Sequence, residues 1–155
     1  IREKAPKHIL EIGTANGYST LHFALALPIG SDITTIEQAW NMHTDAVTHF
    51  KNCKIKNIHA IWGNAKEVIP ILQDEYFDFV FIDAMKKEYL DYLLWVLPKC
   101  SESALIVIDD VEKFRDKMEN LYEWLDRRNV EYRIVKTDAD DSIMMLSRTS
   151  FLWKI

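Results

Sequence analysis

Apolar and polar positions alternate in blocks along this chain, and the blocks predict a regular succession of strands and helices. Short apolar runs predict strands over His8–Ile12, Ile33–Ile36, Ile58–Trp62, Phe77–Ile82 and Leu105–Ile108. Segments with helical periodicity lie between and after them, over Ser19–Leu27, Ala39–Lys51, Ala65–Leu72, Lys87–Val96 and Lys113–Arg128. We expect the last of these to be the longest amphipathic helix. Tyr132–Val135 and Ser142–Leu146 predict a closing pair of strands around an acidic turn at 138–141.

This alternation predicts an α/β fold, with one domain over residues 1–155. Since strand–helix–strand units cross over with a right hand, the seven strands should form a Rossmann-like, doubly wound, mostly parallel sheet with helices on both faces. The run Phe77–Ile82 is almost wholly apolar, as expected of a strand covered on both faces. Ligands bind such folds beyond the carboxyl ends of the strands, so polar residues at those ends are the candidate site.

Composition narrows the classes of function. A net charge of −5 argues against a general polyanion-binding surface. Cys53 and Cys100 form no disulfide framework, which favours a reducing, cytoplasmic compartment. No apolar run reaches the length of a membrane span, and no signal peptide precedes the first strand. We therefore expect a cytoplasmic protein with no membrane partner.

The turn after the first strand carries the most informative residues. It has the spacing Glu-x-Gly-x-x-x-Gly-x-Ser, in which Gly13 and Gly17 allow a sharp turn and a close approach of ligand to backbone. This spacing differs from the Gly-x-Gly-x-x-Gly of dinucleotide folds, so a dinucleotide-dependent oxidoreductase is the weakest candidate. Glu37 closes the second strand twenty residues after Gly17, where a carboxylate can bind both hydroxyls of a ribose.

Three carboxylates follow the fourth and fifth strands. Asp83 comes directly after Ile82, and Asp109 and Asp110 come directly after Ile108. These strands should be neighbours, so the carboxylates converge, and either protons or a cation must relieve their repulsion. A hard cation such as Mg²⁺, Mn²⁺ or Ca²⁺ is the natural partner, although Asp109 and Asp110 could instead cap the next helix.

At this point the chain resembles a known family. The run from Asp83 to Tyr89 is similar to the Asp-x-x-Lys-x-x-Tyr signature of cation-dependent O-methyltransferases, the catechol and caffeoyl-CoA group. The Gly13 turn resembles the first motif of class I S-adenosylmethionine-dependent methyltransferases. The resemblance extends from His8 to Leu146.

The resemblance implies a transferase that moves a methyl group from S-adenosylmethionine to a metal-bound hydroxyl of a small phenolic or catechol-like acceptor. Lys86 matches the catalytic base, which we expect to have a depressed pKa beside the metal and sulfonium charges. The metal ligands, for Mg²⁺ above all, would be Asp83, Asp109 and Asp110. The cofactor-binding residues would be Glu11, Gly13, Thr14, Ala15, Gly17, Tyr18, Ser19, Glu37, Gln38, Gly63, Asn64, Ala65 and Asp83.

The chain also departs from the family pattern. Asp110 stands where the family has Asn, and we expect the domain to lack the helices that usually precede the first strand in this family. No substrate-covering loop is expected, because Val111 and Glu112 lead at once into the predicted helix.

Two alternative functions therefore stay open. One is a tRNA hydroxyuridine methyltransferase of the same family, for which Lys51, Lys54, Lys56, Lys86 and Lys87 are the candidate basic surface. The other is a non-catalytic S-adenosylmethionine-binding module. Assembly into a homodimer also stays open.

Overall fold

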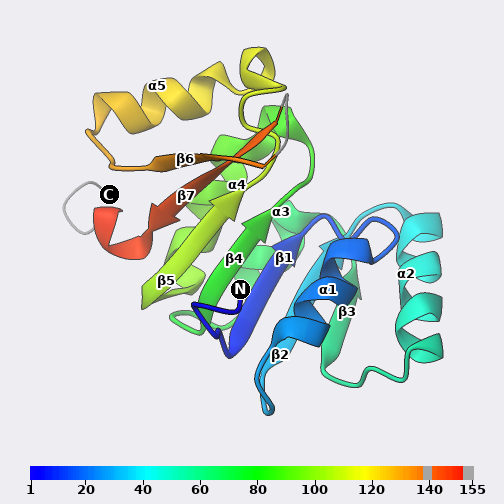
Figure 1. Cartoon of the computed structure of the whole chain (residues 1–155). Helices are drawn as coiled ribbons and strands as arrows, with labels where there is room; N and C mark the ends of the chain where they lie inside the picture. The colour runs from blue at the N-terminus through cyan, green and yellow to red at the C-terminus, as the bar shows by residue number, and fades with distance from the viewer. Residues whose placement is uncertain (138–140, 152–155) are drawn as a thin grey trace.

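Seven strands form one sheet in the computed structural model, which describes residues 1–137 and 141–151. Their order across the sheet is β3-β2-β1-β4-β5-β7-β6. The strands are β1 (His8–Ile12), β2 (Asp32–Glu37), β3 (Ile58–Trp62), β4 (Phe77–Ile82), β5 (Cys100–Ile108), β6 (Arg133–Lys136) and β7 (Ser142–Ser147). The first five pair in parallel, while β7 runs antiparallel to β5 and to β6 at the edge (Figure 1). The predicted mostly parallel, seven-stranded sheet is confirmed.

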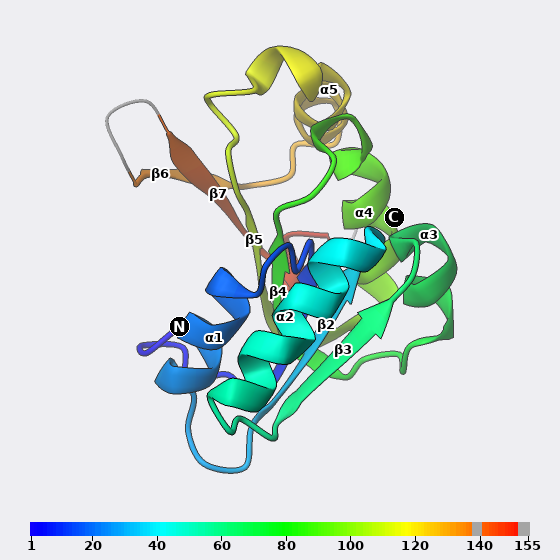
Figure 2. The same ribbon diagram turned by 90° about the vertical axis from the view of Figure 1, so that its right-hand side faces the viewer.

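Helices cover both faces of this sheet. They are α1 (Tyr18–Ala26), α2 (Trp40–Asn52), α3 (Ala65–Val68), α4 (Tyr89–Val96) and α5 (Glu119–Arg127). Figures 1 and 2 show α1 and α2 on one face and α3, α4 and α5 on the other. Side chains along β1 alternate between these layers: Leu10 belongs to the larger apolar cluster with α4 and α5, and Ile9 packs in the smaller one with Phe23 of α1.

The predicted helix over Lys113–Arg128 is wrong in its first part. Only Glu119–Arg127 is α-helical, and α2, with 13 residues, is the longest helix in the described part of the chain. The preceding segment contains a single 3-10 turn, Arg115–Lys117. Val111 and Met118 are both fully buried at its ends, so two separate anchors satisfy the apolar spacing without a continuous helix. The segment 109–118 is therefore a loop beside the site, contrary to our expectation.

Smaller differences at other element ends also have local causes. Helix α3 ends at Val68 and passes into a 3-10 turn over Ile69–Ile71, because Pro70 lacks the N–H that would continue the α-helix. Strand β5 begins at Cys100, five residues earlier than predicted, with a register shift against β4.

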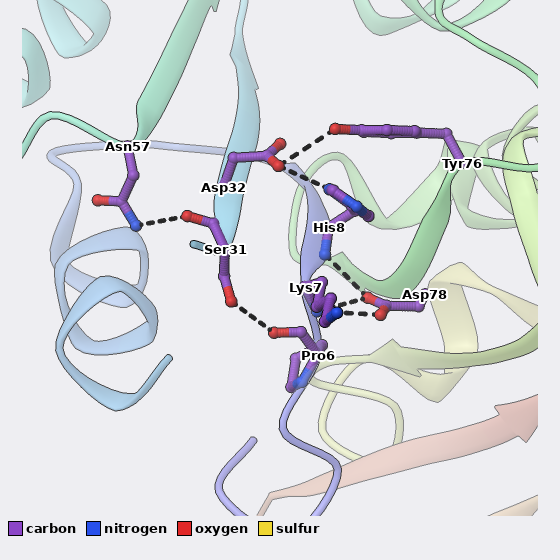
Figure 3. Close-up of polar contacts among 8 residues, drawn as sticks. All are labelled: Pro6, Lys7, His8, Ser31, Asp32, Asn57, Tyr76 and Asp78. Carbon is purple, nitrogen blue, oxygen red and sulfur yellow. Dashed lines mark hydrogen bonds and ion pairs between the residues drawn. The ribbon is translucent and has the colours of Figure 1, made fainter. Parts of the chain in front are cut away.

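The amino ends of β1, β2 and β4 are held by a set of polar contacts, shown in Figure 3. His8 Nδ1 lies 2.6 Å from Asp32 Oδ1, and the Tyr76 hydroxyl donates to the same oxygen at 3.1 Å. The Asp78 carboxylate accepts the backbone N–H groups of Lys7 and His8. These side chains satisfy one another at the end of the sheet opposite the candidate site.

Candidate functional site

Gly13 brings the carboxyl ends of β1 and β4 into backbone contact. Its φ is +99°, and a Cβ atom placed on it would lie 1.9 Å from the carbonyl oxygen of Asp83. The Asp83 N–H in turn donates to the carbonyl of Ile12 at 3.0 Å. No side chain fits in this space, so glycine is required for Asp83 to reach the turn that follows β1.

Gly17 serves a different purpose from Gly13. It is the N-cap of α1 with φ +85°, and a Cβ atom there would lie 2.6 Å from the ring of Phe50 in α2. Gly17 therefore lets the two helices on this face approach each other. It does not line either of the cavities described below, although it was predicted to bind the cofactor.

Glu11, which was also predicted to bind the cofactor, is fully buried beneath the turn and lines neither cavity. Its carboxylate accepts hydrogen bonds from the hydroxyls of Ser19 (2.5 Å), Thr20 (2.5 Å) and Thr35 (2.6 Å). Burial raises the pKa of Glu11, and these three hydrogen bonds oppose the shift. Glu11 thus ties β1, β2 and the start of α1 together and supports the site from below.

The first of the two cavities, the Glu37 cavity, has a volume of about 330 Å³ beyond β1 and β2. The two Glu37 oxygens accept the backbone N–H groups of Ala15 (2.9 Å) and Ala39 (2.8 Å), which fixes the carboxylate at the rim. The predicted cofactor-binding residues that line this cavity are Gly13, Ala15, Glu37, Gln38, Gly63, Ala65 and Asp83.

Asn64, which was also predicted to bind the cofactor, is the N-cap of α3. Its side chain accepts the Lys66 N–H at 2.9 Å and caps α3, while its neighbours Gly63 and Ala65 line the cavity. Met85 and Tyr92 also line the Glu37 cavity and were not predicted. Both come from the segment after β4, and the signature between Asp83 and Tyr89 was the signal that could have pointed to them.

The second cavity, the Asp109 cavity, has a volume of about 500 Å³ and lies between α1 and the ends of β4 and β5. The predicted residues that line it are Gly13, Thr14, Ala15, Tyr18, Ser19, Asp83 and Asp109. Gly13, Ala15 and Asp83 line both cavities, so the two spaces adjoin at the turn after β1. The crevice is therefore extended, with a carboxylate rim at one end and further carboxylates at the other.

Lys86 contacts the other two residues of the signature motif, Asp83 and Tyr89, and also Asp110. Its Nζ lies 2.7 Å from Asp83 Oδ1, 2.6 Å from Asp110 Oδ2 and 2.6 Å from the Tyr89 hydroxyl. Burial by itself lowers the pKa of Lys86, but the hydrogen bonds to Asp110 and Asp83 outweigh it and raise the pKa. This direction is opposite to the one we expected beside metal and sulfonium charges, and it holds Lys86 as an ammonium in this arrangement.

Three carboxylates come close enough to share one cation, but they are not the predicted three. Oxygen atoms of Asp109, Asp110 and Asp141 all lie within 4.8 Å of one another. Asp83 contacts Lys86 instead. Sequence reasoning missed Asp141, which precedes β7 and is placed there by the antiparallel pairing of Ile108 with Met144.

The raised pKa values in this cluster show that its negative charges repel one another and need a compensating positive charge. Burial raises the pKa of Asp109, and the neighbouring carboxylates of Asp83, Asp110 and Asp141 raise it further. A hydrogen bond shared with Asp110 raises the pKa of Asp141. Such a group is stabilised by a proton or by a hard cation, and an all-oxygen donor set suits Mg²⁺ or Ca²⁺. The residues present therefore fit the cation that the sequence motif implies.

Comparison with known proteins agrees with this geometry. A profile of the family described as O-methyltransferase matches residues 1–141. The chain belongs to the O-methyltransferase family. This confirms the resemblance drawn from the motifs.

Three of the five lysines of the candidate basic surface lie away from the crevice. Lys51, Lys54 and Lys56 are at the end of α2 and in the loop before β3, away from the carboxyl ends of the strands.

Individual relatives give the same result. A catechol O-methyltransferase of Niastella koreensis is 35% identical over 109 residues, which cover 68% of this chain and 49% of that protein. A catechol O-methyltransferase of Mycobacterium tuberculosis is 32% identical over 106 residues, which cover 68% and 48%. The chain thus spans about half the length of these relatives. The O-methyltransferase TomG of Streptomyces achromogenes, solved in complex with SAM, superposes with a TM-score of 0.85 at 25% identity, over 94% of this chain and 75% of that one.

Within residues 1–137 and 141–151, none of the helices has both the length and the apolar character that crossing a bilayer demands.

Proposed function

We propose that this chain is an S-adenosylmethionine-dependent O-methyltransferase acting on a small hydroxylated acceptor. The observation that carries the proposal is the extended crevice, in which the Glu37 and Asp109 cavities adjoin at Gly13 and Asp83. The Glu37 cavity offers a carboxylate to the ribose, and the Asp109 cavity leads to the acidic cluster. A SAM-bound relative and two relatives named catechol O-methyltransferase support this assignment.

Four carboxylates are candidates to hold a divalent cation. Asp109, Asp110 and Asp141 already lie together, and Asp83 adjoins them through Lys86. When bound, the cation would make a hydroxyl near it more acidic and would orient it. A small phenolic or catechol-like acceptor fits this chemistry, and the names of the relatives support it.

Lys86 is the residue we assign as the general base. Its side chain is only 14% exposed, and its Nζ is within hydrogen-bond distance of two carboxylates at the strand ends. It can accept a proton only when its contacts with Asp83 and Asp110 are loosened, because these hold it as an ammonium. The turn at Gly13 and the Glu37 carboxylate contribute orientation of the methyl donor, which supplies much of the rate in such a transfer.

Calorimetric titration with S-adenosylhomocysteine, the product of the methyl donor, tests the cofactor assignment. We expect saturable binding at one site per chain, weakened when Glu37 is replaced. Absence of binding would refute the proposal. Binding of the product without any methyl transfer would favour the non-catalytic module.

A further inference from the structure

The mechanism above gives no role to His22, a polar side chain that lines the Asp109 cavity. His22 lies on α1, one turn after Tyr18 and Ser19, and all three residues line this cavity. The imidazole of His22 packs against the Tyr18 ring, with ring centroids 4.5 Å apart. The two residues are four apart on α1, so the helix places their rings side by side, and both side chains are exposed to the cavity and solvent.

The charges around this cavity are unevenly distributed. Asp83 and Asp109 line it on the strand side, where they favour a positive group of a ligand. On the helix side, His22 alone among the described lining residues can carry a positive charge. A zwitterion, with its ammonium toward the carboxylates and its own carboxylate toward α1, matches this distribution.

We propose that His22 binds the carboxylate at the amino-acid end of S-adenosylmethionine. The proposal rests on the proposed function and adds to it a residue that distinguishes the complete cofactor from its adenosine portion. An imidazole N–H donates to a carboxylate in either charge state of the ring.

The position of His22 on α1 supports this contact. Helical side chains lean toward the helix N-terminus, so the His22 ring lies over the first turn of α1. The first N–H groups of a helix have no partner within it, and the Tyr18 N–H is already bonded to Asn16 Oδ1 at 3.2 Å. The imidazole therefore adds a side-chain donor beside the Ser19 end of the cavity.

Two ligands separate this role from a structural one. S-Adenosylhomocysteine carries the amino-acid end, and 5′-methylthioadenosine has the same adenosine and thioether without it. Calorimetry with both ligands should be run on the parent chain and on His22→Ala, His22→Gln and His59→Ala. His59 is an exposed histidine on β3 that lines neither cavity, which makes His59→Ala the matched control.

We expect His22→Ala to weaken S-adenosylhomocysteine about tenfold, the effect of one lost hydrogen bond to a charged group, with methylthioadenosine affinity unchanged. His22→Gln keeps an N–H donor and should retain most of the affinity, and His59→Ala should equal the parent. An equal loss for both ligands, or no loss for either, would overturn the proposal. If the parent chain binds S-adenosylhomocysteine and His22→Ala binds it equally well, the His22 inference fails alone; if the parent chain does not bind S-adenosylhomocysteine, the proposed function fails with it.

Discussion

Lys86 Nζ lies 2.6 Å from Asp110 Oδ2, so the proposed base is ion-paired with a candidate cation ligand. Asp110 follows β5 and Lys86 opens the 3-10 turn after β4, which means that this contact also joins two neighbouring strand ends. This ion pair distinguishes Lys86 from its neighbour Lys87, whose side chain is exposed. Neighbouring lysines of one turn therefore provide an internal comparison.

Lys86→Ala should lower the rate of methyl transfer by roughly a hundredfold to ten-thousandfold, the range of a lost general base. The affinity for S-adenosylhomocysteine should change little, because Lys86 lines neither cavity. Single-turnover assays of methyl transfer measure the rate, and calorimetry measures the affinity.

Lys87→Ala is the control for this experiment and should keep the parent rate. Lys86→Arg should restore little activity, since a guanidinium does not give up its proton. Equal rates for Lys86→Ala and Lys87→Ala would show that Lys86 is not the base.

Gly13→Ala should destabilise the protein strongly. A methyl group there would overlap the Asp83 carbonyl, and Gly13 has φ +99°. Gly30 is the matched control, because it has φ +89° and open space around its Cβ position. Gly30→Ala should cost only about 1–2 kcal/mol of unfolding free energy from the left-handed backbone. Urea denaturation measures both variants, and similar losses would contradict the backbone contact between β1 and β4.

Glu37→Ala should weaken the binding of S-adenosylhomocysteine by about 1.5–3 kcal/mol through lost charge-assisted hydrogen bonds. Calorimetry with Glu67→Ala, an exposed glutamate of α3, provides the comparison. Because Glu37 also accepts the N–H groups of Ala15 and Ala39, thermal melts should accompany the titrations. An affinity equal to that of Glu67→Ala would remove Glu37 from the site.

The two cysteines should differ in reactivity. Burial raises the pKa of Cys100 to about 12, against a smaller opposing effect of Arg148, whereas Cys53 is exposed. A thiol reagent at pH 8 should therefore label Cys53 in the native protein and Cys100 only after denaturation. Peptide mass spectrometry identifies the labelled site, and rapid native labelling of Cys100 would contradict the packing around the start of β5.

Much of the fold follows from local pattern. Apolar runs such as Ile58–Trp62 and Phe77–Ile82 match strands β3 and β4 residue for residue. Residues that directly follow parallel strands meet at one edge of the sheet because the strands end together, and this is why the sequence predicted that Asp83 after β4 and Asp109 after β5 lie close together. Periodicity could not distinguish a single helix over Lys113–Arg128 from two buried anchors joined by a loop.

The remaining differences depend on contacts between distant segments. Glu11 resembles a ligand residue in the sequence, but its partners Ser19, Thr20 and Thr35 come from two other elements and keep it buried. Asp141 joins the acidic cluster only through the antiparallel register of β5 and β7. The other residues of the predicted acidic turn, 138–140, lie outside the described residues.

The most direct test of the account is transfer of a radiolabelled methyl group from S-adenosylmethionine to catechol by the chelator-treated protein, with and without added Mg²⁺. We expect labelled O-methylated product when Mg²⁺ is present and little without it, because the carboxylates at the ends of β4 and β5 would hold the cation. Equal product in the presence of chelator would contradict the cation site, and no product with Mg²⁺ would contradict the proposed methyl transfer to a catechol-like acceptor.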